Sequence, residues 1–111
     1  MDMEQANELS RLRETIQKID EEIVRLYTAR MECAGQVAQY KKAHGIPVLN
    51  SEVEKRKMEE LSLMVPEPFR ESLKQLYAGI FAVSREYQER LIREGTGAYR
   101  RDGNEANGER K

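Results

Sequence analysis

The feature that most constrains this fold is an apolar repeat that no proline interrupts. From Leu9 to Tyr40, apolar side chains recur at alternating steps of three and four, the spacing of one face of an α-helix. The pattern predicts a single helix over about residues 5–43, ended at Gly45. A helix of that length is unusual in so short a chain and indicates a coiled-coil-like packing partner.

Two shorter helices are predicted after this long one. Asn50 or Ser51 is placed to cap the first of them, which extends to about residue 64. Two prolines then break the chain, and apolar residues at three-four spacing run through a last helix over about residues 67–93. The sequence therefore predicts an all-α fold with three helices per chain, one very long, one short and one long.

The chain is long enough for one domain, which we place at residues 5–94. Residues 95–111 combine many charges and glycines with almost no apolar side chains, so we expect a disordered tail or the remnant of a linker. The apolar stripe of the long helix exceeds what two shorter helices can cover. A second copy of the chain would cover the rest, which predicts an intertwined helical homodimer.

Composition and charge exclude several classes of partner. The formal net charge of −1 gives no field that would attract nucleic acid, and aromatic residues, at 6%, are too sparse for a base-stacking platform. We find no apolar run of membrane-spanning length and no charged-then-apolar leader, so we expect no membrane association. The single cysteine cannot form an internal disulfide, which fits a cytoplasmic location.

Covalent and metal-dependent chemistry lacks its usual residues. One histidine and one cysteine make no metal-ligand set. No serine has a histidine base at a suitable spacing, and no glycine-rich phosphate loop occurs. We therefore expect neither a metal nor a cofactor.

Arg30 interrupts the apolar repeat of the long helix, because it lies in line with Ile16, Ile23 and Val37. A buried guanidinium without a partner costs several kcal/mol, so the fold should supply an anion. A helix glutamate, or a side chain that extends to water at the edge of the domain, would satisfy Arg30 structurally. The functional alternative is an anionic ligand bound inside the helical bundle.

Helical geometry relates Arg30 to two other cations. Lys41 follows Arg30 by eleven residues, about three turns, so both side chains project from nearly one face, about 16 Å apart along the axis. Arg13 precedes Arg30 by seventeen residues, which places it about 25 Å away and about a quarter turn round the helix. Arg13 is therefore either an ordinary solvated residue or a contribution to the site of a partner chain.

Three polar residues of the shorter helices are further candidates. Ser84 and Gln88 are four residues apart, so they share one helical face beside apolar positions. They are either boundary residues or neutral hydrogen-bonding groups of a cationic pocket. Glu54 is either a carboxylate favoured by the helix dipole or an acceptor for a ligand hydroxyl.

Several segments together resemble the all-helical chorismate mutase family. These are LRETIQKIDEEIVRLYTARMECAGQVAQYKKAHGIPVLN, the following E-x-E, and IFAVSREYQ. The order and spacing of L-R-x-x-I-x-x-I-D, the mid-helix arginine, V-A-x-x-K, the P-V turn and S-x-x-x-Q agree with the family pattern over about residues 9–92. The chain looks especially like the mutase domain that precedes prephenate dehydratase in bifunctional enzymes, which would make the tail a linker remnant.

The resemblance implies rearrangement of chorismate to prephenate, in phenylalanine and tyrosine biosynthesis, by an intertwined homodimer with two active sites. Each site would consist mostly of one chain. By position, Arg13 would be donated across the dimer, Arg30 would clamp a substrate carboxylate, and Lys41 would reach the ether oxygen and a carboxylate. Glu54 would accept from the ring hydroxyl.

Ser84 and Gln88 would complete this pocket, with Gln88 near the ether oxygen. The reaction transfers no proton or hydride, so it needs no cofactor and no covalent intermediate. The enzyme must hold a compact diaxial conformer and stabilise the negative charge that develops on the ether oxygen. Lys41 and Gln88 would supply that stabilisation.

Two positions depart from the family pattern. Asn50 replaces the usual aspartate after the P-V turn, and Val53 replaces the usual arginine before the glutamate. Asn50 remains a candidate contact if its backbone binds the substrate. Val53 removes a positive charge from the rim of the pocket, and Arg56, one turn further on, would partly replace it.

Three alternatives remain open at the level of the sequence. An isochorismate-pyruvate lyase on the same fold would explain why Val53 replaces an arginine at the rim of the pocket. The presence of Glu54 and Ser84 favours the mutase. An aminodeoxychorismate mutase would use a closely related substrate. A non-catalytic helical dimer would bind a dicarboxylate and regulate another enzyme without turnover.

Overall fold

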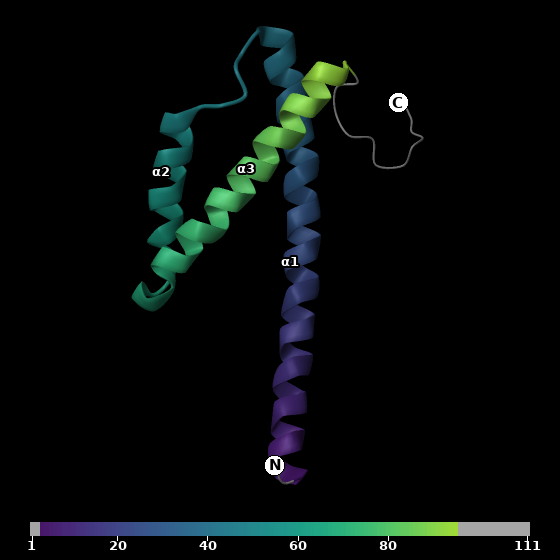
Figure 1. The fold of residues 1–111 in the computed structure, drawn as a ribbon, viewed down its shortest axis with the longest axis vertical. Coiled ribbons are helices and arrows are strands. Elements are labelled where there is room, and N and C mark those ends of the chain that lie inside the picture. The colour runs from purple at the N-terminus through teal and green to yellow at the C-terminus, as the bar shows by residue number, and fades with distance from the viewer. Residues whose placement is uncertain (1–2, 96–111) are drawn as a thin grey trace. The chain divides into compact units, whose positions relative to one another are not determined.

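The computed structural model describes residues 3–95, and helices make up its regular structure (Figure 1). The elements follow the chain as α1 (Met3–His44), α2 (Ser51–Ser62), the 3-10 turn η1 (Glu67–Phe69) and α3 (Arg70–Glu94). The predicted all-α fold with one very long helix is confirmed over these residues. The tail predicted from residue 95 onward lies, from residue 96, outside the described residues, and the domain limits of 5–94 stay a prediction.

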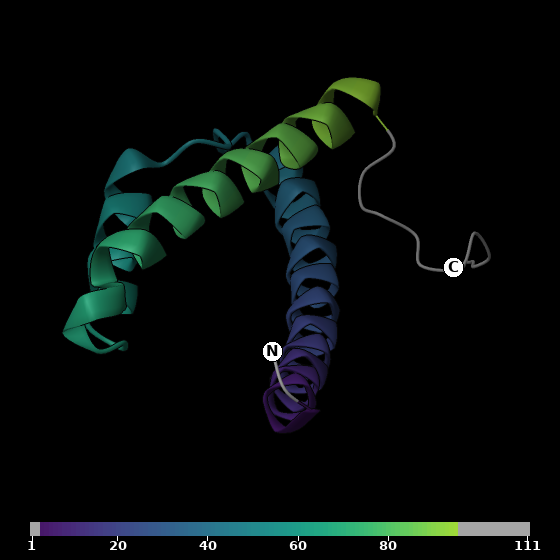
Figure 2. The ribbon, with the colours of Figure 1, turned by 60° about the horizontal axis from the view of Figure 1, so that its bottom comes forward.

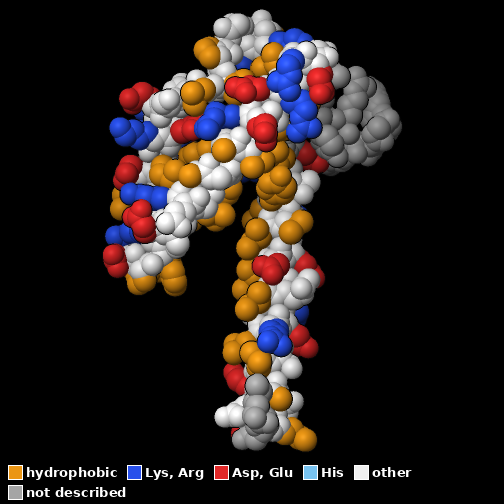
Figure 3. All heavy atoms as spheres, in the orientation of Figure 1, with side chains coloured by type: hydrophobic (Ala, Val, Ile, Leu, Met, Phe, Trp, Pro, Cys, Tyr) orange, Lys and Arg blue, Asp and Glu red, His pale blue; other side chains and the backbone are white. Residues whose placement is uncertain are grey.

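The first compact unit, residues 1–31, consists in its described part of the N-terminal portion of α1. Its apolar repeat is exposed, since each aliphatic side chain from Leu12 to Leu26 in the repeat is more than half accessible to solvent. Figure 3 shows hydrophobic side chains following one another along α1. We call these residues the α1 stripe: Leu12, Ile16, Ile19, Ile23 and Leu26.

Ion pairs one turn apart also stabilise this part of α1. Arg25 donates from Nη2 to Glu22 Oε1 over 2.7 Å, and Arg11 pairs with Glu8 in the same way. The hydrogen bond and positive charge of Arg25 lower the pKa of the Glu22 carboxyl. Such exposed i,i+3 pairs stabilise the helix locally. This matters because α1 has little tertiary packing within this unit.

The second unit, residues 32–95 of the described chain, contains the C-terminal turns of α1 together with α2 and α3. Its buried positions on α3 are Phe81, Ser84, Gln88 and Leu91, which recur at steps of three, four and three and so form one helical face. Phe81, Ser84 and Gln88 each follow by one residue a position of the apolar repeat, namely Ile80, Val83 and Tyr87, whereas Leu91 belongs to both sets. Val83 of the repeat remains 42% exposed. The two polar residues singled out from the sequence therefore lie on the buried face.

The C-terminal turns of α1 bury small side chains, namely Ala34, Gly35 and Ala38. Cys33 and Val37, which lie on the other side of these turns, are both exposed. α2 lies beside α3 in both ribbon views (Figures 1 and 2), and the two helices are in contact. The second unit is therefore built round the α2–α3 pair and a small-residue face of α1.

Local signals determine where the helices begin and end. Gly45, with φ of 65°, ends α1, as predicted, and Gly95, with φ of 75°, caps α3. Residues 67–69 form a 3-10 turn before α3, whereas the sequence predicted one helix from residue 67. Pro68 within that turn has no N–H to continue an α-helical ladder. None of the helices within residues 3–95 is long and apolar enough to cross a membrane.

Candidate active site

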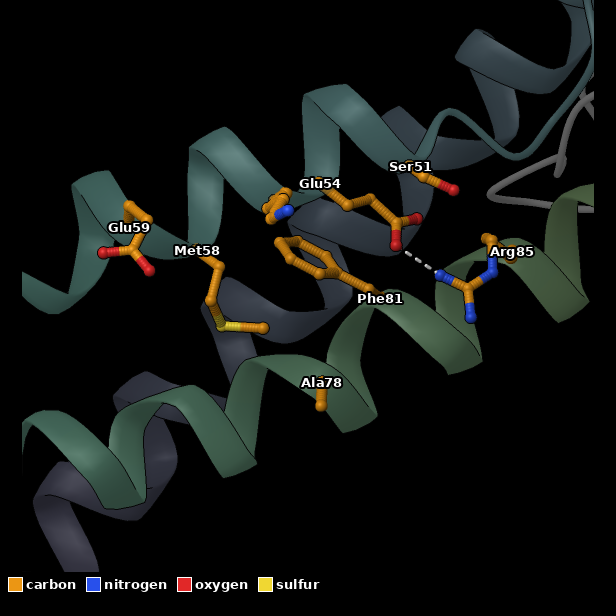
Figure 4. Close-up of a pocket in the computed structure, with 8 residues that line it drawn as sticks. Ser51, Glu54, Met58, Glu59, Ala78, Phe81 and Arg85 are labelled. Carbon is orange, nitrogen blue, oxygen red and sulfur yellow. Dashed lines mark hydrogen bonds and ion pairs between the residues drawn. The ribbon is translucent and has the colours of Figure 1, made fainter.

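A pocket of about 340 Å³ lies between α2 and α3 (Figure 4). A cavity of this size is within the range that binds small molecules. Its lining combines apolar side chains with two acids and two bases. The residues that line it are Ser51, Glu54, Lys55, Met58, Glu59, Ala78, Phe81 and Arg85.

An ion pair joins the two helices at this pocket. Arg85 Nη1 of α3 donates to Glu54 Oε1 of α2 over 2.5 Å, and Figure 4 shows the two side chains pointing toward each other. Their side chains are 31% and 26% exposed, so solvent screens this pair less than the more exposed pairs of α1. Glu54, a predicted site residue, therefore has a cationic partner within the pocket.

Sequence reasoning missed Arg85. Its neighbours Ala78 and Phe81 on α3 precede it at steps of three and four, so the three residues share the face that lines the pocket. This spacing was the available signal. The charge of Arg85 was not distinctive, because the chain contains many other charged residues. The pairing with Glu54, 31 residues away, has no local signature.

Ser84 and Gln88 form the buried polar pair of α3. Gln88 Nε2 donates to Ser84 Oγ over 3.1 Å, and each residue is 7% exposed. Gln88 Oε1 is buried and has no hydrogen-bond partner among the described residues. Because an unsatisfied buried acceptor is costly, a donor from a ligand or a second chain would stabilise this group.

Lys41 is half-buried near the end of α1. Its Nζ donates to the backbone carbonyl of Val48 over 2.8 Å, which connects the last turns of α1 to the loop before α2. A lysine ammonium has three N–H donors, so this bond leaves others for a ligand. The contact fixes the position of the ammonium. A positive charge stabilises negative charge on a bound molecule best when its position is fixed.

Asn50 lies directly before the first residue of α2. Its Oδ1 accepts from the backbone N–H of Val53 over 3.1 Å, which makes Asn50 the N-cap of the helix. The side chain of Val53 is 45% exposed, and Arg56 is also exposed. Neither Val53 nor Arg56 lines the α2–α3 pocket.

Arg13 and Arg30 belong to the first unit and are described along α1 alone. Arg13 is exposed, whereas Arg30 is half-buried. Because α1 is continuous from Met3 to His44, the helical spacing used to relate Arg13, Arg30 and Lys41 rests on an unbroken helix. Within the second unit, the structure brings Ser84 together with Gln88 and joins Glu54 to Arg85.

The residue types of this site suit binding and electrostatic stabilisation of an anion more than covalent chemistry. Cations, a carboxylate, a hydroxyl and an amide are present, and within residues 3–95 no cluster of three His, Cys, Asp or Glu side chains is arranged to hold a metal ion. Such fixed donors act on charge that develops within a bound molecule. This set of groups fits the binding of an anionic molecule.

Comparison with known protein families finds a match to the family described as chorismate mutase type II, over residues 12–89. The match covers more than half of the chain and includes every candidate residue discussed above. No curated protein and no solved structure matches the chain at a significant level.

Proposed function

Since the chain belongs to the type II chorismate mutase family, and is therefore an isomerase that rearranges chorismate to prephenate, we propose which of its residues perform the reaction. The substrate-binding set is Arg13, Arg30, Lys41, Asn50, Glu54, Ser84 and Gln88. Within it, the proposed catalytic groups are Arg13, Arg30, Lys41 and Gln88. The buried Ser84–Gln88 pair is the observation that carries this assignment, because its unsatisfied oxygen lies on the same helical face as its hydroxyl.

The rearrangement is intramolecular, since a carbon–oxygen bond breaks as a carbon–carbon bond forms within one molecule. The protein therefore has to hold the reactive diaxial conformer, which two clamped carboxylates achieve. Arg30 and Arg13 act as the clamps. This role lowers the entropic part of the barrier, because the two reacting ends are already adjacent in the bound substrate.

Charge stabilisation is the second contribution. The ether oxygen gains negative charge in the transition state, and the ammonium of Lys41 and the amide N–H of Gln88 stabilise it there more than in the ground state. One amide N–H of Gln88 binds Ser84 Oγ, which leaves the second for the ether oxygen. Glu54 accepts a hydrogen bond from the ring hydroxyl through the oxygen that does not bind Arg85.

The active form is a homodimer in which Arg13 of one chain completes the site of the other. The exposed α1 stripe supports this assembly, because burying a leucine or isoleucine side chain stabilises by about 1.5–3 kcal/mol. Arg13 also supports it, since it is exposed and directly follows Leu12 of the stripe. A second copy that covers the stripe would therefore contact the helix turn that carries Arg13.

The test is the loss of chorismate absorbance with formation of prephenate, measured on the purified protein. The same protein is incubated separately with isochorismate and with aminodeoxychorismate, which separates the mutase from a lyase and from an aminodeoxychorismate mutase. We expect turnover of chorismate in preference to both. Binding of chorismate without turnover would contradict the catalytic assignment and favour a regulatory dimer.

A further inference from the structure

The ion pair between Glu54 and Arg85 places a carboxylate and a guanidinium together in the lining of the α2–α3 pocket. The second acid of the lining, Glu59, is 66% exposed and pairs with Lys74 at 3.5 Å, so solvent screens it more strongly. Glu54, at 26% exposed, is the carboxylate whose charge a bound molecule would experience most. Arg85 is the group that neutralises this charge.

The geometry of the pair leaves groups on both partners for a ligand. The bond joins Nη1 of Arg85 to Oε1 of Glu54, and among the described residues no donor binds Oε2 of Glu54. A guanidinium has five N–H donors, of which this bond uses one. Figure 4 shows the ring of Phe81 between the two helices beside this pair, so an apolar group adjoins the charges.

The charge of the substrate decides what this arrangement does. Chorismate carries two carboxylates, and Glu54 belongs to the proposed substrate-binding set, so an unneutralised Glu54 would repel them. Of the two bases among the described residues of the lining, Lys55 is exposed, whereas Arg85 is the one that pairs with Glu54. Arg56 was the residue that the sequence suggested for this role, but it is exposed and lies outside the lining.

We propose that Arg85 is a substrate-positioning residue, which holds Glu54 so that Oε2 accepts from the ring hydroxyl and which cancels the repulsion between Glu54 and the substrate carboxylates. This inference rests on the proposed function. Arg85 acts through Glu54, so its effect belongs to substrate binding more than to the chemical step. Arg85 also provides, from α3, the positive charge that Val53 of α2 lacks.

The test is a double-mutant cycle on steady-state kinetics with chorismate. Arg85→Met should raise KM at least about tenfold and change kcat by less than about threefold, since it removes ground-state binding. In a Glu54→Gln background the same substitution should change KM by less than about twofold, because no carboxylate remains to be neutralised. Arg85→Lys, which keeps the charge, should recover most of the affinity.

Arg93→Met is the matched control, because it removes a guanidinium from an exposed position of α3 that does not line the pocket. It should leave KM unchanged. If the methionine variant of Arg85 unfolds in circular dichroism, Arg85→Gln takes its place. An unchanged KM in the Arg85 variants, an equal effect of Arg93→Met, or an equal penalty in both Glu54 backgrounds would overturn the inference.

The same assay separates this inference from the proposed function. An inactive wild-type protein contradicts the proposed function. An active wild-type protein whose KM does not depend on Arg85 contradicts the role of Arg85 and leaves the mutase assignment intact.

Discussion

Lys41 combines a structural contact with a proposed catalytic one. Its bond to the Val48 carbonyl fixes the ammonium near the end of α1, and the remaining N–H groups could bind a substrate without a further cost of ordering the side chain. Fixed charges of this kind are effective because no reorganisation is needed as the transition state forms. At this scale, a single substitution tests the assignment.

Lys41→Ala should lower kcat/KM at least about a hundredfold, since loss of one preorganised donor costs about 2.7–4 kcal/mol. The helices should remain folded, because one part-buried hydrogen bond to the loop is worth about 0.5–1.5 kcal/mol. Lys42→Ala, at the exposed neighbouring position, is the control and should retain the wild-type rate. A near-normal rate in Lys41→Ala would contradict its catalytic role.

Gln88 offers a second test at the residue scale, because its buried oxygen has no donor in the described chain. Gln88→Leu should reduce kcat/KM about a hundredfold, through loss of the amide N–H. The free energy of unfolding should change by less than about 1 kcal/mol, since the lost bond to Ser84 is offset by removal of an unsatisfied acceptor. Thermal unfolding and chorismate turnover measure the two effects, with Gln75→Leu on the exposed side of α3 as control. A strongly destabilised but active variant would indicate a purely structural glutamine.

Among the elements, α2 depends most on its first turn. It is twelve residues long, and Asn50 satisfies the N–H of Val53 at its start. A short helix gains little from its own propensity, so capping and contact with α3 account for much of its stability. The cap also sets where Glu54 emerges, one turn into the helix.

Asn50→Ala should therefore lower the melting temperature by about 4–8 °C, which corresponds to about 1 kcal/mol in a domain of this size. Asn50→Asp should retain the wild-type value, because aspartate also caps and its charge favours the helix N-terminus. Differential scanning calorimetry measures both, and Ser51→Ala serves as the neighbouring control. Equal melting temperatures for Asn50→Ala and wild type would show that the cap contributes nothing.

At the scale of the whole molecule, the question is where Arg13 acts. A continuous α1 keeps Arg13 about 25 Å along the axis from Arg30, so one chain cannot bring both to one carboxylate from the same helix. A second copy removes this restriction, because its own α1 can lie alongside. The exposed α1 stripe indicates which side of the helix such a copy would cover.

Complementation between two inactive variants tests donation of Arg13 across a dimer. Arg13→Ala and Lys41→Ala chains, mixed in equal amounts and refolded together, should regain about a quarter of the wild-type activity, because half of randomly paired dimers contain one intact site. Each variant refolded alone controls for residual activity, and sedimentation confirms the dimer. No recovery from a fully dimeric mixture would show that Arg13 acts within its own chain.

Much of the secondary structure was predictable because its determinants are local. Three-four spacing and the absence of proline predicted α1 over residues 5–43, and the structure has it at 3–44. Gly45 and Asn50 act through backbone groups within a few residues of themselves. Their roles in ending α1 and capping α2 could therefore be predicted from the sequence. The start of α3 was less predictable, because the prolines allowed either an α-helix or the 3-10 turn that the structure shows.

The amino-acid sequence was enough to predict the helices, the family and a set of candidate residues at defined helical positions. Tertiary structure alone decided that α3 buries the face with Ser84 and Gln88, each of which follows a position of its apolar repeat by one residue. It also decided that Glu54 meets Arg85. Helical periodicity arises from hydrogen bonds between residues four apart, whereas a pair 31 residues apart depends on how α2 lies on α3. No local pattern encodes that packing.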